Sequence, residues 1–444
     1  MVVPYAAGAR ARLARTSAAS GGEATQRGLE DRRSEAIGLA TAIDLEVVAA
    51  LLVPLATPSP ATLLGSGKVK ELGDDIAASE VDLVIVDQAL TPGQQRNLER
   101  AWSAKVIDRT GLILEIFGHR ARTREGRLQV ELAHLTYQRS RLVRSWTHLE
   151  RQRGGFGFLG GPGETQIETD RRLLQERIVA IRKELDGVVR TRELHRIGRR
   201  RVPYPIVAIV GYTNAGKSTL FNRLTGADVL AMDQVFATLD PTMREVALPS
   251  GRKIILSDTV GFISDLPTSL VAAFRATLEE VLAADLILHV RDIAHPESAA
   301  QKEDVERVLG ELGAGSAADG KTRLEVWNKI DTLNDARRSE IEHAAQRSDA
   351  APVLISAATG EGIERLLAEI ERTLSMSDDI LVIDVPASAG HLRHWLYENT
   401  EVLARDAGDD GIERFRIRLE RSKRGRLEGR LQEAGLRLGA ASSN

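Results

Sequence analysis

The sequence has no cysteine, no apolar run long enough to cross a membrane and almost no net charge. Without cysteine the chain can form neither disulfide bridges nor thiolate metal sites, which fits a reducing compartment and predicts a cytoplasmic location. The longest apolar run, Val47 to Ala56, has ten residues, whereas a membrane-spanning helix needs about 20. We therefore expect no membrane span.

The net charge of −3 over 444 residues is unevenly distributed. Residues 118–201 contain 20 Lys and Arg against 10 Asp and Glu, a local charge of +10, so the remainder carries −13. A basic segment within an acidic chain predicts a polyanionic partner. The chain is also too long for one ordinary hydrophobic core, so we expect two to four domains.

One stretch, Gly211 to Ser218, has the pattern of a phosphate-binding loop. The apolar run Ile206 to Val210 precedes it, as in a strand buried on both faces of a parallel sheet, and a helical pattern follows from Leu220. Glycines let backbone N–H groups face the phosphates, and the helix N-terminus adds partial positive charge. Lys217 can reach the β- and γ-phosphates, and the Ser218 hydroxyl can ligate Mg²⁺. The residues expected to bind nucleotide here are Gly211, Tyr212, Thr213, Asn214, Ala215, Gly216, Lys217 and Ser218.

Three further motifs follow predicted buried strands, and one of them selects guanine. Asp258 can hold the Mg²⁺ shell, and the Gly261 N–H can meet the γ-phosphate. The Asp331 carboxylate only accepts hydrogen bonds, so it suits the N1–H and N2–H₂ donors of guanine. The residues of these motifs are Asp258, Thr259, Val260, Gly261, Asn328, Lys329, Asp331, Ser356 and Ala357. Four motifs in order predict a GTPase domain over residues 202–377, with GTP as substrate, GDP as product and Mg²⁺ as cofactor.

The loop between the first two motifs should carry the first switch threonine. Its candidate stretch comprises Phe236, Ala237, Thr238, Leu239 and Asp240. Thr238 is expected to ligate Mg²⁺ and to act in hydrolysis with Lys217 and Gly261, although Thr242 is a nearby rival. Phe262 stands where many GTPases have the glutamine that orients the attacking water. Intrinsic hydrolysis should therefore be slow unless a partner or another group supplies this function.

The residues before the GTPase domain form two predicted units and an extension. Residues 1–33 are rich in Ala, Gly, Arg and Ser without an apolar period, which predicts a disordered extension. Residues 34–117 read as a small α/β domain, with strands at Val81 to Asp87 and Lys105 to Asp108. Its helices are expected at Val69 to Ala78 and Pro92 to Trp102. The Gly65-Ser-Gly-Lys68 turn lacks the spacing of a phosphate loop and is interpreted as a helix cap.

Residues 118–201 are predicted to form an antiparallel helical hairpin. Apolar residues recur every seven positions in both halves, with further apolar residues at the intervening positions. The first seam comprises Leu128, Leu132, Leu135, Leu142, Trp146 and Leu149, and the second Ile167, Leu174, Ile178, Ile181, Leu185 and Val188. These narrow seams favour a coiled-coil hairpin over two surface helices packed on a globular core.

The tip of this hairpin, residues 151–164, has six glycines, more than a chain reversal needs. Phe156 and Phe158 are unfavourable in solvent unless they contact a partner. Arg151 and Arg153 next to aromatic rings suit RNA, because bases stack on rings and phosphates pair with guanidinium groups. These four residues are the predicted rRNA contacts, unless the loop packs back on the protein's own domains.

Residues 378–444 are predicted to be a small α+β domain. Ile380 to Val385 and Phe415 to Leu419 alternate like strands, and His391 to Leu403 reads as a helix. A basic edge could be either a solvated face or a second contact with a polyanion. It comprises Arg414, Arg416, Arg418, Arg421, Lys423, Arg424 and Arg426.

These motifs together resemble the HflX family of ribosome-associated GTPases. The resemblance rests on four stretches and extends from about Gly65 to the end of the GTPase domain, and more loosely beyond. The stretches are residues 108–117 (DRTGLILEIF), 128–133 (LQVELA), 161–170 (GPGETQIETD) and 211–218 (GYTNAGKS). In that family Thr238 corresponds to the switch threonine, and a hydrophobic residue at Phe262 is the rule.

The resemblance implies that the protein binds the large ribosomal subunit and its rRNA and splits or rescues stalled ribosomes, with the hairpin tip near the peptidyl-transferase region. It implies no DNA partner and a monomer away from the ribosome. Some members also hydrolyse ATP through the N-terminal region, which nothing in this sequence supports independently. Two alternatives stay open: a signalling GTPase whose hairpin binds protein effectors, and a hairpin that acts only as a spacer.

Overall fold

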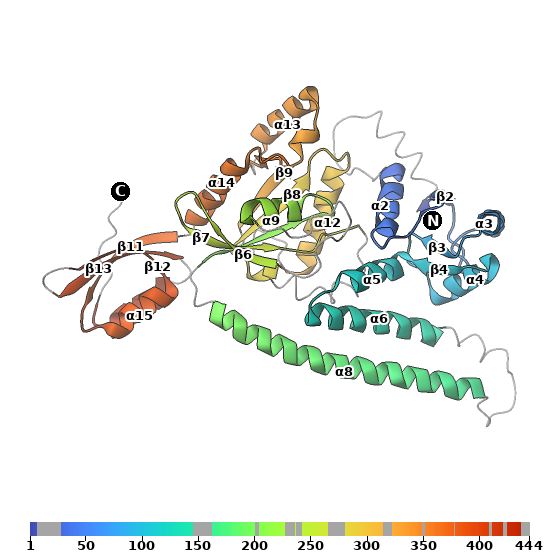
Figure 1. The fold of residues 1–444 in the computed structure, drawn as a ribbon, viewed down its shortest axis with the longest axis horizontal. Coiled ribbons are helices and arrows are strands. Elements are labelled where there is room, and N and C mark those ends of the chain that lie inside the picture. The colour runs from blue at the N-terminus through green and yellow to red at the C-terminus, as the bar shows by residue number, and fades with distance from the viewer. Residues whose placement is uncertain are drawn as a thin grey trace.

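The computed structural model describes the greater part of the chain (Figure 1). The described residues are 1–6, 28–144, 162–199, 204–226, 236, 242–264, 280–313, 322–348, 351–376, 378–407, 411–420 and 424–436. They form three sheets with their helices: one in the N-terminal domain, one in the GTPase domain and one in the C-terminal domain. The two helices of a hairpin lie beneath the N-terminal and GTPase domains in Figure 1. In the described part of the chain no helix is both long and apolar enough to span a bilayer.

The N-terminal sheet is parallel, with strand order β2-β1-β3-β4. Its strands are β1 (Val2–Ala6), β2 (Leu51–Leu55), β3 (Leu83–Val86) and β4 (Lys105–Asp108). The prediction that residues 1–33 are a disordered extension is wrong for residues 1–6 and 28–33, the parts of this range that the structure describes. Val2, Val3 and Tyr5 are buried in β1, and helix α2 begins at Leu29. Strand β1 pairs with residues about 50 positions away, so no local period could reveal it.

Four helices accompany this sheet: α2 (Leu29–Thr41), α3 (Ser66–Ala78), α4 (Pro92–Trp102) and α5 (Arg109–Arg120). Helix α4 has the predicted bounds, because Thr91 and Gln94 form a capping box that fixes its start. Gly65 is the N-cap of α3, in accord with the interpretation of this turn as a helix cap. Helix α5 continues beyond residue 117, the predicted end of the domain, and lies over the hairpin.

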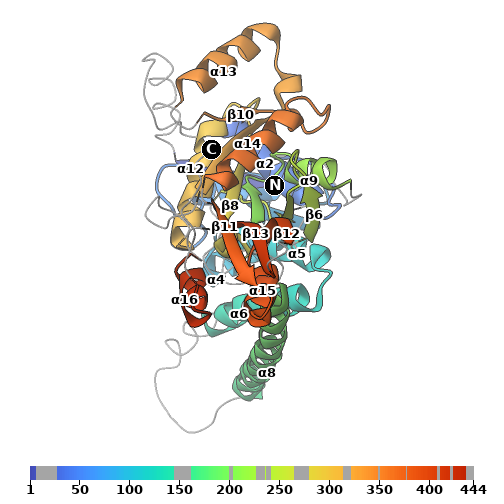
Figure 2. The same cartoon turned by 90° about the vertical axis from the view of Figure 1, so that its left-hand side faces the viewer.

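The hairpin consists of α6 (Arg124–Arg144) and α8 (Pro162–Arg199). The helices run antiparallel: Arg177 bonds Glu131 at 2.8 and 3.0 Å, and Arg124, earlier in α6, pairs with Glu184, later in α8. Ile178 and Ile181 of the predicted seam are fully buried. Helix α6 is not free on its other side, however, because Val130, Ala133 and Tyr137 pack into the core that includes α5. Both views show α8 on the outer side of α6 (Figure 1, Figure 2).

The GTPase domain is built on a sheet of six strands in the order β10-β9-β8-β5-β7-β6, in which β6 alone is antiparallel to its neighbour. The strands are β5 (Ile206–Gly211), β6 (Thr242–Ala247), β7 (Lys253–Asp258), β8 (Leu286–Asp292), β9 (Thr322–Asn328) and β10 (Val353–Leu354). The helices are α9 (Lys217–Thr225), α12 (Ser298–Glu311), α13 (Asp335–Arg347) and α14 (Ile363–Ser375), with a short 3₁₀ turn η3 (Ile330–Thr332). Parallel strands place the ends of β5, β7, β9 and β10 on one edge, where the predicted motifs meet.

The C-terminal domain has an antiparallel sheet in the order β11-β13-β12, covered by two helices. Its elements are β11 (Asp378–Pro386), α15 (Gly390–Asn399), β12 (Glu401–Ala407), β13 (Ile412–Glu420) and α16 (Arg424–Glu433). The predicted helix, His391 to Leu403, therefore extends beyond the observed helix, which ends at Asn399. Thr400 is extended and starts the turn into β12, which is held in place by the later strand β13.

Three residues of the basic edge of this domain form ion pairs, and Arg421 and Lys423 lie outside the described residues. Arg414 pairs with Asp384 at 2.7 Å, and Arg418 pairs with Glu401 at 2.9 Å. Arg424 pairs with Asp379 at 3.2 Å. These contacts favour the solvated face over a second polyanion contact, because neighbouring carboxylates offset the positive charge that a polyanion would need.

Candidate nucleotide site

The loop from β5 to α9 joins the phosphate-binding residues to the second motif. The Lys217 ammonium donates a 2.7 Å hydrogen bond to the Tyr212 carbonyl oxygen, and the Ser218 hydroxyl donates one of 2.8 Å to Asp258. Gly216 has φ +89°, and a Cβ there would lie 2.2 Å from the Asn328 side-chain nitrogen. Only glycine fits this position, since both backbone conformation and space exclude a side chain.

Burial lowers the pKa of the Lys217 ammonium to about 8, an effect that Asp258 opposes and Lys329 reinforces. In the protein without nucleotide, the Lys217 side chain is therefore mostly charged below pH 8 and mostly neutral above it. A bound triphosphate should keep the ammonium charged, so binding should take up a proton near pH 8.

We expect the binding enthalpy of a non-hydrolysable GTP analogue near pH 8 to vary with the ionisation enthalpy of the buffer, and to vary less near pH 6.5. Isothermal titration calorimetry in two buffers measures this proton uptake. The Lys217→Arg variant should lose it, because a guanidinium group stays charged at both pH values. Buffer-independent enthalpy near pH 8 in the parental protein would contradict a depressed pKa at Lys217.

The base-recognition motifs are connected to the phosphate loop through Asn328. Its side-chain nitrogen donates to the Ala215 carbonyl oxygen at 2.8 Å, and its side-chain oxygen accepts from the Ala357 N–H at 2.9 Å. Both contacts are buried, so Asn328 fixes the distance between the phosphate and base ends of the site. Asp331 lies at the adjacent η3 turn with an exposed side chain, accessible to a base.

The segment after Asp258 is bonded directly to the phosphate loop. The Thr213 N–H donates to the Phe262 carbonyl oxygen at 2.7 Å, and the Phe262 N–H donates to the Gly211 carbonyl oxygen at 3.1 Å. A Cβ on Gly261 would lie 3.0 Å from the Lys217 ammonium nitrogen. The Phe262 ring is 3 % exposed and belongs to a large apolar cluster, so its role in this structure is packing.

The switch residues are placed only in part. Phe236 is buried, and its ring meets that of Phe117 from α5 edge to face at 4.7 Å. Ala237, Thr238, Leu239 and Asp240 lie outside the described residues, as do the tip residues Arg151, Arg153, Phe156 and Phe158. Thr242, the rival of Thr238, is in β6 opposite Asp258. The roles of Thr238 and of the tip stay predictions.

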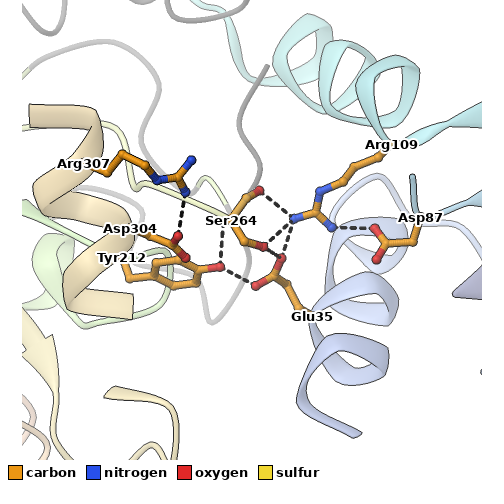
Figure 3. A network of polar contacts seen from close by, with 7 residues as sticks. All are labelled: Glu35, Asp87, Arg109, Tyr212, Ser264, Asp304 and Arg307. Atoms are coloured by element: carbon orange, nitrogen blue, oxygen red, sulfur yellow. Dashed lines mark hydrogen bonds and ion pairs between the residues drawn. The ribbon is translucent and has the colours of Figure 1, made fainter. Parts of the chain in front are cut away.

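Sequence reasoning missed a polar network between the N-terminal domain and this site. Glu35 and Arg109 reach the Tyr212 side chain and Ser264 (Figure 3). Tyr212 lies within the phosphate-loop motif, and 177 positions separate it from Glu35. A local pattern cannot reveal such a contact.

Comparisons with known proteins decide the family. Four family models match along the chain: "GTP-binding GTPase N-terminal" at residues 30–118, "GTP-binding GTPase Middle Region" at 120–199, "50S ribosome-binding GTPase" at 206–329 and "HflX C-terminal domain" at 340–437. The GTPase HflX of Magnetococcus marinus is 52 % identical over 402 residues, which are 90 % of this chain and 91 % of that protein. The chain belongs to the HflX family of GTPases.

Other similar proteins include the GTPase HflX of Escherichia coli, 47 % identical over 82 % of this chain and 83 % of that protein. A GTP-binding protein from Sulfolobus solfataricus, solved in complex with GDP, is 25 % identical with a TM-score of 0.42, over 78 % of this chain and 96 % of that one.

Membership of the HflX family confirms the predicted α/β fold with a phosphate-loop GTPase domain and confirms that the protein binds and hydrolyses GTP. Nothing in the comparisons favours the signalling alternative. The comparisons do not extend this activity to ATP.

Proposed function

We propose that this HflX-family GTPase binds the ribosome, mainly the large subunit and its rRNA, and splits or rescues stalled ribosomes in the cytoplasm. Hydrolysis is stimulated on the ribosome, and the protein is a monomer away from it. The observation that carries the proposal is the combination of a GTPase site, matched by the "50S ribosome-binding GTPase" model, with a basic helical hairpin. The proposal includes no DNA partner and no membrane span.

The site geometry supports specific roles for the nucleotide-binding residues. Backbone N–H groups of residues 211–216 would hold the β-phosphate, and Lys217 would bridge the β- and γ-phosphates. Oxygen ligands suit Mg²⁺, and the bonded pair Ser218 and Asp258 provides a hydroxyl and a carboxylate at one point. Ser218 and Thr238 would ligate Mg²⁺, with Asp258 in its shell, and the ion would neutralise phosphate charge. Asp331 would read guanine.

The hairpin presents a surface suited to RNA. Helix α8 exposes several cations, among them Arg171, Arg172, Arg182, Lys183 and Arg190. Leu173 and Val179 on the same helix are 54 % and 55 % exposed. A cleft of about 1100 Å³ between the start of α4 and the hairpin is partly lined by Arg139, Arg171 and Arg172. Exposed guanidinium groups can pair with phosphates, and exposed apolar side chains can contact bases.

Deleting residues 154–161 tests the proposal, because it removes both tip phenylalanines and ends before α8 begins at Pro162. We expect GTP hydrolysis without ribosomes to stay within about twofold of the parental rate. The nucleotide site lies on another domain, and shortening a loop changes its closure entropy little. The rate of ribosome-stimulated GTP hydrolysis and the rate of subunit splitting should each fall about tenfold or more. Losing a few contacts with a combined free energy of about 1.4 kcal/mol is enough for a tenfold change. If ribosomes stimulate hydrolysis by the deletion variant as strongly as by the parental protein, the tip does not contribute to ribosome binding as proposed.

Charge and stacking at the tip should be separable. The Arg151→Ala, Arg153→Ala double variant should reduce the dependence of ribosome affinity on salt by about one unit of slope for each lost phosphate contact. The matched Phe156→Ala, Phe158→Ala variant should weaken binding with little change in slope, because stacking releases no counterions. Co-sedimentation over a salt series measures both. Equal slopes in the two variants would argue against rRNA contact by the arginines.

A further inference from the structure

The helix of the phosphate loop is bonded to the loop that follows β10. Arg223 lies in α9, six positions after Lys217, and its guanidinium group donates to two successive backbone carbonyl oxygens. Its Nε atom bonds the Ala357 oxygen at 3.1 Å, and a terminal nitrogen bonds the Ala358 oxygen. Residues 356–360, the base loop, begin with two predicted nucleotide-binding residues.

The base loop is a compact turn with Arg223 packed against it. The Gly360 N–H donates to the Ser356 carbonyl oxygen at 2.8 Å, and the Thr359 N–H donates to the Ser356 hydroxyl at 3.1 Å. Gly360 has φ +95°, which favours glycine, and a Cβ there would lie 3.5 Å from a terminal nitrogen of Arg223. Arg223 therefore contacts the turn as a whole and not only its two carbonyl oxygens.

One backbone donor of the base loop is left for a ligand. The Ala357 N–H is bonded to the Asn328 side-chain oxygen at 2.9 Å, and the two N–H groups that follow Ala358 are bonded within the loop. In the part of the chain that the structure describes, the Ala358 N–H has no hydrogen bond, and Ala358 is exposed. Guanine has an acceptor, O6, where adenine has an amino donor. An accessible N–H at this point therefore suits guanine and not adenine.

Arg223 controls the direction of this N–H through one peptide unit. The Ala357 carbonyl group and the Ala358 N–H belong to the same planar peptide, in which the C=O and N–H bonds point in opposite directions. A donor that fixes the carbonyl oxygen on one side therefore fixes the N–H on the other. The positive charge next to the oxygen also polarises the peptide, which makes the N–H a stronger donor.

We propose that Arg223 is a positioning residue for guanine specificity: it holds the base loop so that the Ala358 N–H meets O6 of the base. The inference rests on the proposed role of Asp331 in base recognition, but not on ribosome binding. Asp331 pairs with N1–H and the 2-amino group, whereas the Ala358 N–H pairs with the oxygen at position 6. The two contacts recognise different atoms of guanine, so nucleotide analogues test them separately.

Three diphosphates test the proposal in the full-length protein without ribosomes: GDP, IDP, which lacks the 2-amino group, and 6-thio-GDP, which has sulfur in place of O6. Sulfur accepts hydrogen bonds weakly, and the chain has no cysteine that could form a disulfide with it. In Arg223→Ala we expect the affinities for GDP and IDP to fall about fivefold, the effect of one hydrogen bond. The affinity for 6-thio-GDP should change by less than about twofold. Competition against a fluorescent GDP analogue measures all three affinities.

The Asp331→Asn variant separates failure of this proposal from failure of the base site. It should reduce the preference for GDP over IDP and keep the preference for GDP over 6-thio-GDP, the reverse of Arg223→Ala. An unchanged ratio of GDP to IDP affinity in Asp331→Asn would remove the base site, and the inference with it. An unchanged ratio of GDP to 6-thio-GDP affinity in Arg223→Ala would overturn the role of Arg223 alone.

Two further variants show whether Arg223 positions the base loop or only stabilises it. Arg223→Lys keeps the charge, but an ammonium group lacks the planar fork that spans two carbonyl oxygens. It should therefore lose part of the preference for GDP over 6-thio-GDP. Arg338→Ala breaks an exposed ion pair with Glu361, next to the base loop, and should change no ratio, because such pairs contribute little.

Equal losses for all three nucleotides in Arg223→Ala would contradict the proposal, because a general loosening of the site weakens every nucleotide. Equal binding of GDP and 6-thio-GDP by the parental protein would contradict it as well. If Arg223→Ala fails to fold, Arg223→Lys takes its place in the comparison. The parental ratio of GDP to 6-thio-GDP affinity in that variant would then overturn the proposal.

Discussion

Replacing Lys217 with alanine should lower the affinity for GTP by about 10²- to 10⁴-fold. In the proposed role the Lys217 ammonium bridges the β- and γ-phosphates, and each charge-assisted hydrogen bond contributes about 1.5–3 kcal/mol. Two such bonds together contribute roughly 3–6 kcal/mol, and each 1.4 kcal/mol is a factor of ten in affinity. Hydrolysis at saturating GTP should fall as well, because Lys217 also stabilises charge that develops in the transition state.

The fold should survive this substitution. Lys217 is buried, and its depressed pKa shows that the charged form is disfavoured there without nucleotide. Losing the ammonium therefore removes an electrostatic cost together with its hydrogen bond to the Tyr212 carbonyl. Titration with a fluorescent GTP analogue, combined with thermal unfolding, separates the two effects. Parental affinity in a folded variant would show that the phosphates bind elsewhere.

Replacing Asp331 with asparagine should change the preferred base from guanine to xanthine. In the proposed role the carboxylate accepts hydrogen bonds from two guanine donors, whereas the amide would present a donor to one of them. Leaving these groups mismatched costs about 2–4 kcal/mol, so the affinity for GTP should fall roughly 30- to 1000-fold. Xanthine carries an oxygen where guanine carries an amino group, so the amide can pair with both positions.

Competition by GTP and XTP against a labelled nucleotide measures this exchange of specificity. Asn328→Ala serves as a contrasting variant, since that side chain links Ala215 and Ala357. It should weaken binding of both nucleotides without changing their ratio. Unchanged affinity for GTP in Asp331→Asn would remove this carboxylate from base recognition.

Local patterns were sufficient for the elements that local chemistry controls. The phosphate loop, the Asp258 motif and the Asn328 motif each follow a strand of consecutive apolar residues, so strand and motif could be predicted together. Helix α4 was predicted with its observed bounds because the Thr91 capping box lies within four residues of sequence. The seam of α8 was correct at Ile178 and Ile181, since a helical period repeats within one segment.

The sequence by itself thus determined the family, the GTPase motifs and the positions of most helices and strands. The tertiary structure decided which distant segments pair. Strand β1 depends on β2, and β12 depends on the later β13. Helix α6 is covered on both sides because α5 folds over it. The sequence predicts Tyr212 only as a nucleotide-binding residue of the phosphate loop, whereas the fold brings Glu35 of the N-terminal domain to its hydroxyl. Contacts between residues far apart in the chain leave no period in either partner, because their geometry exists only after the domains have packed.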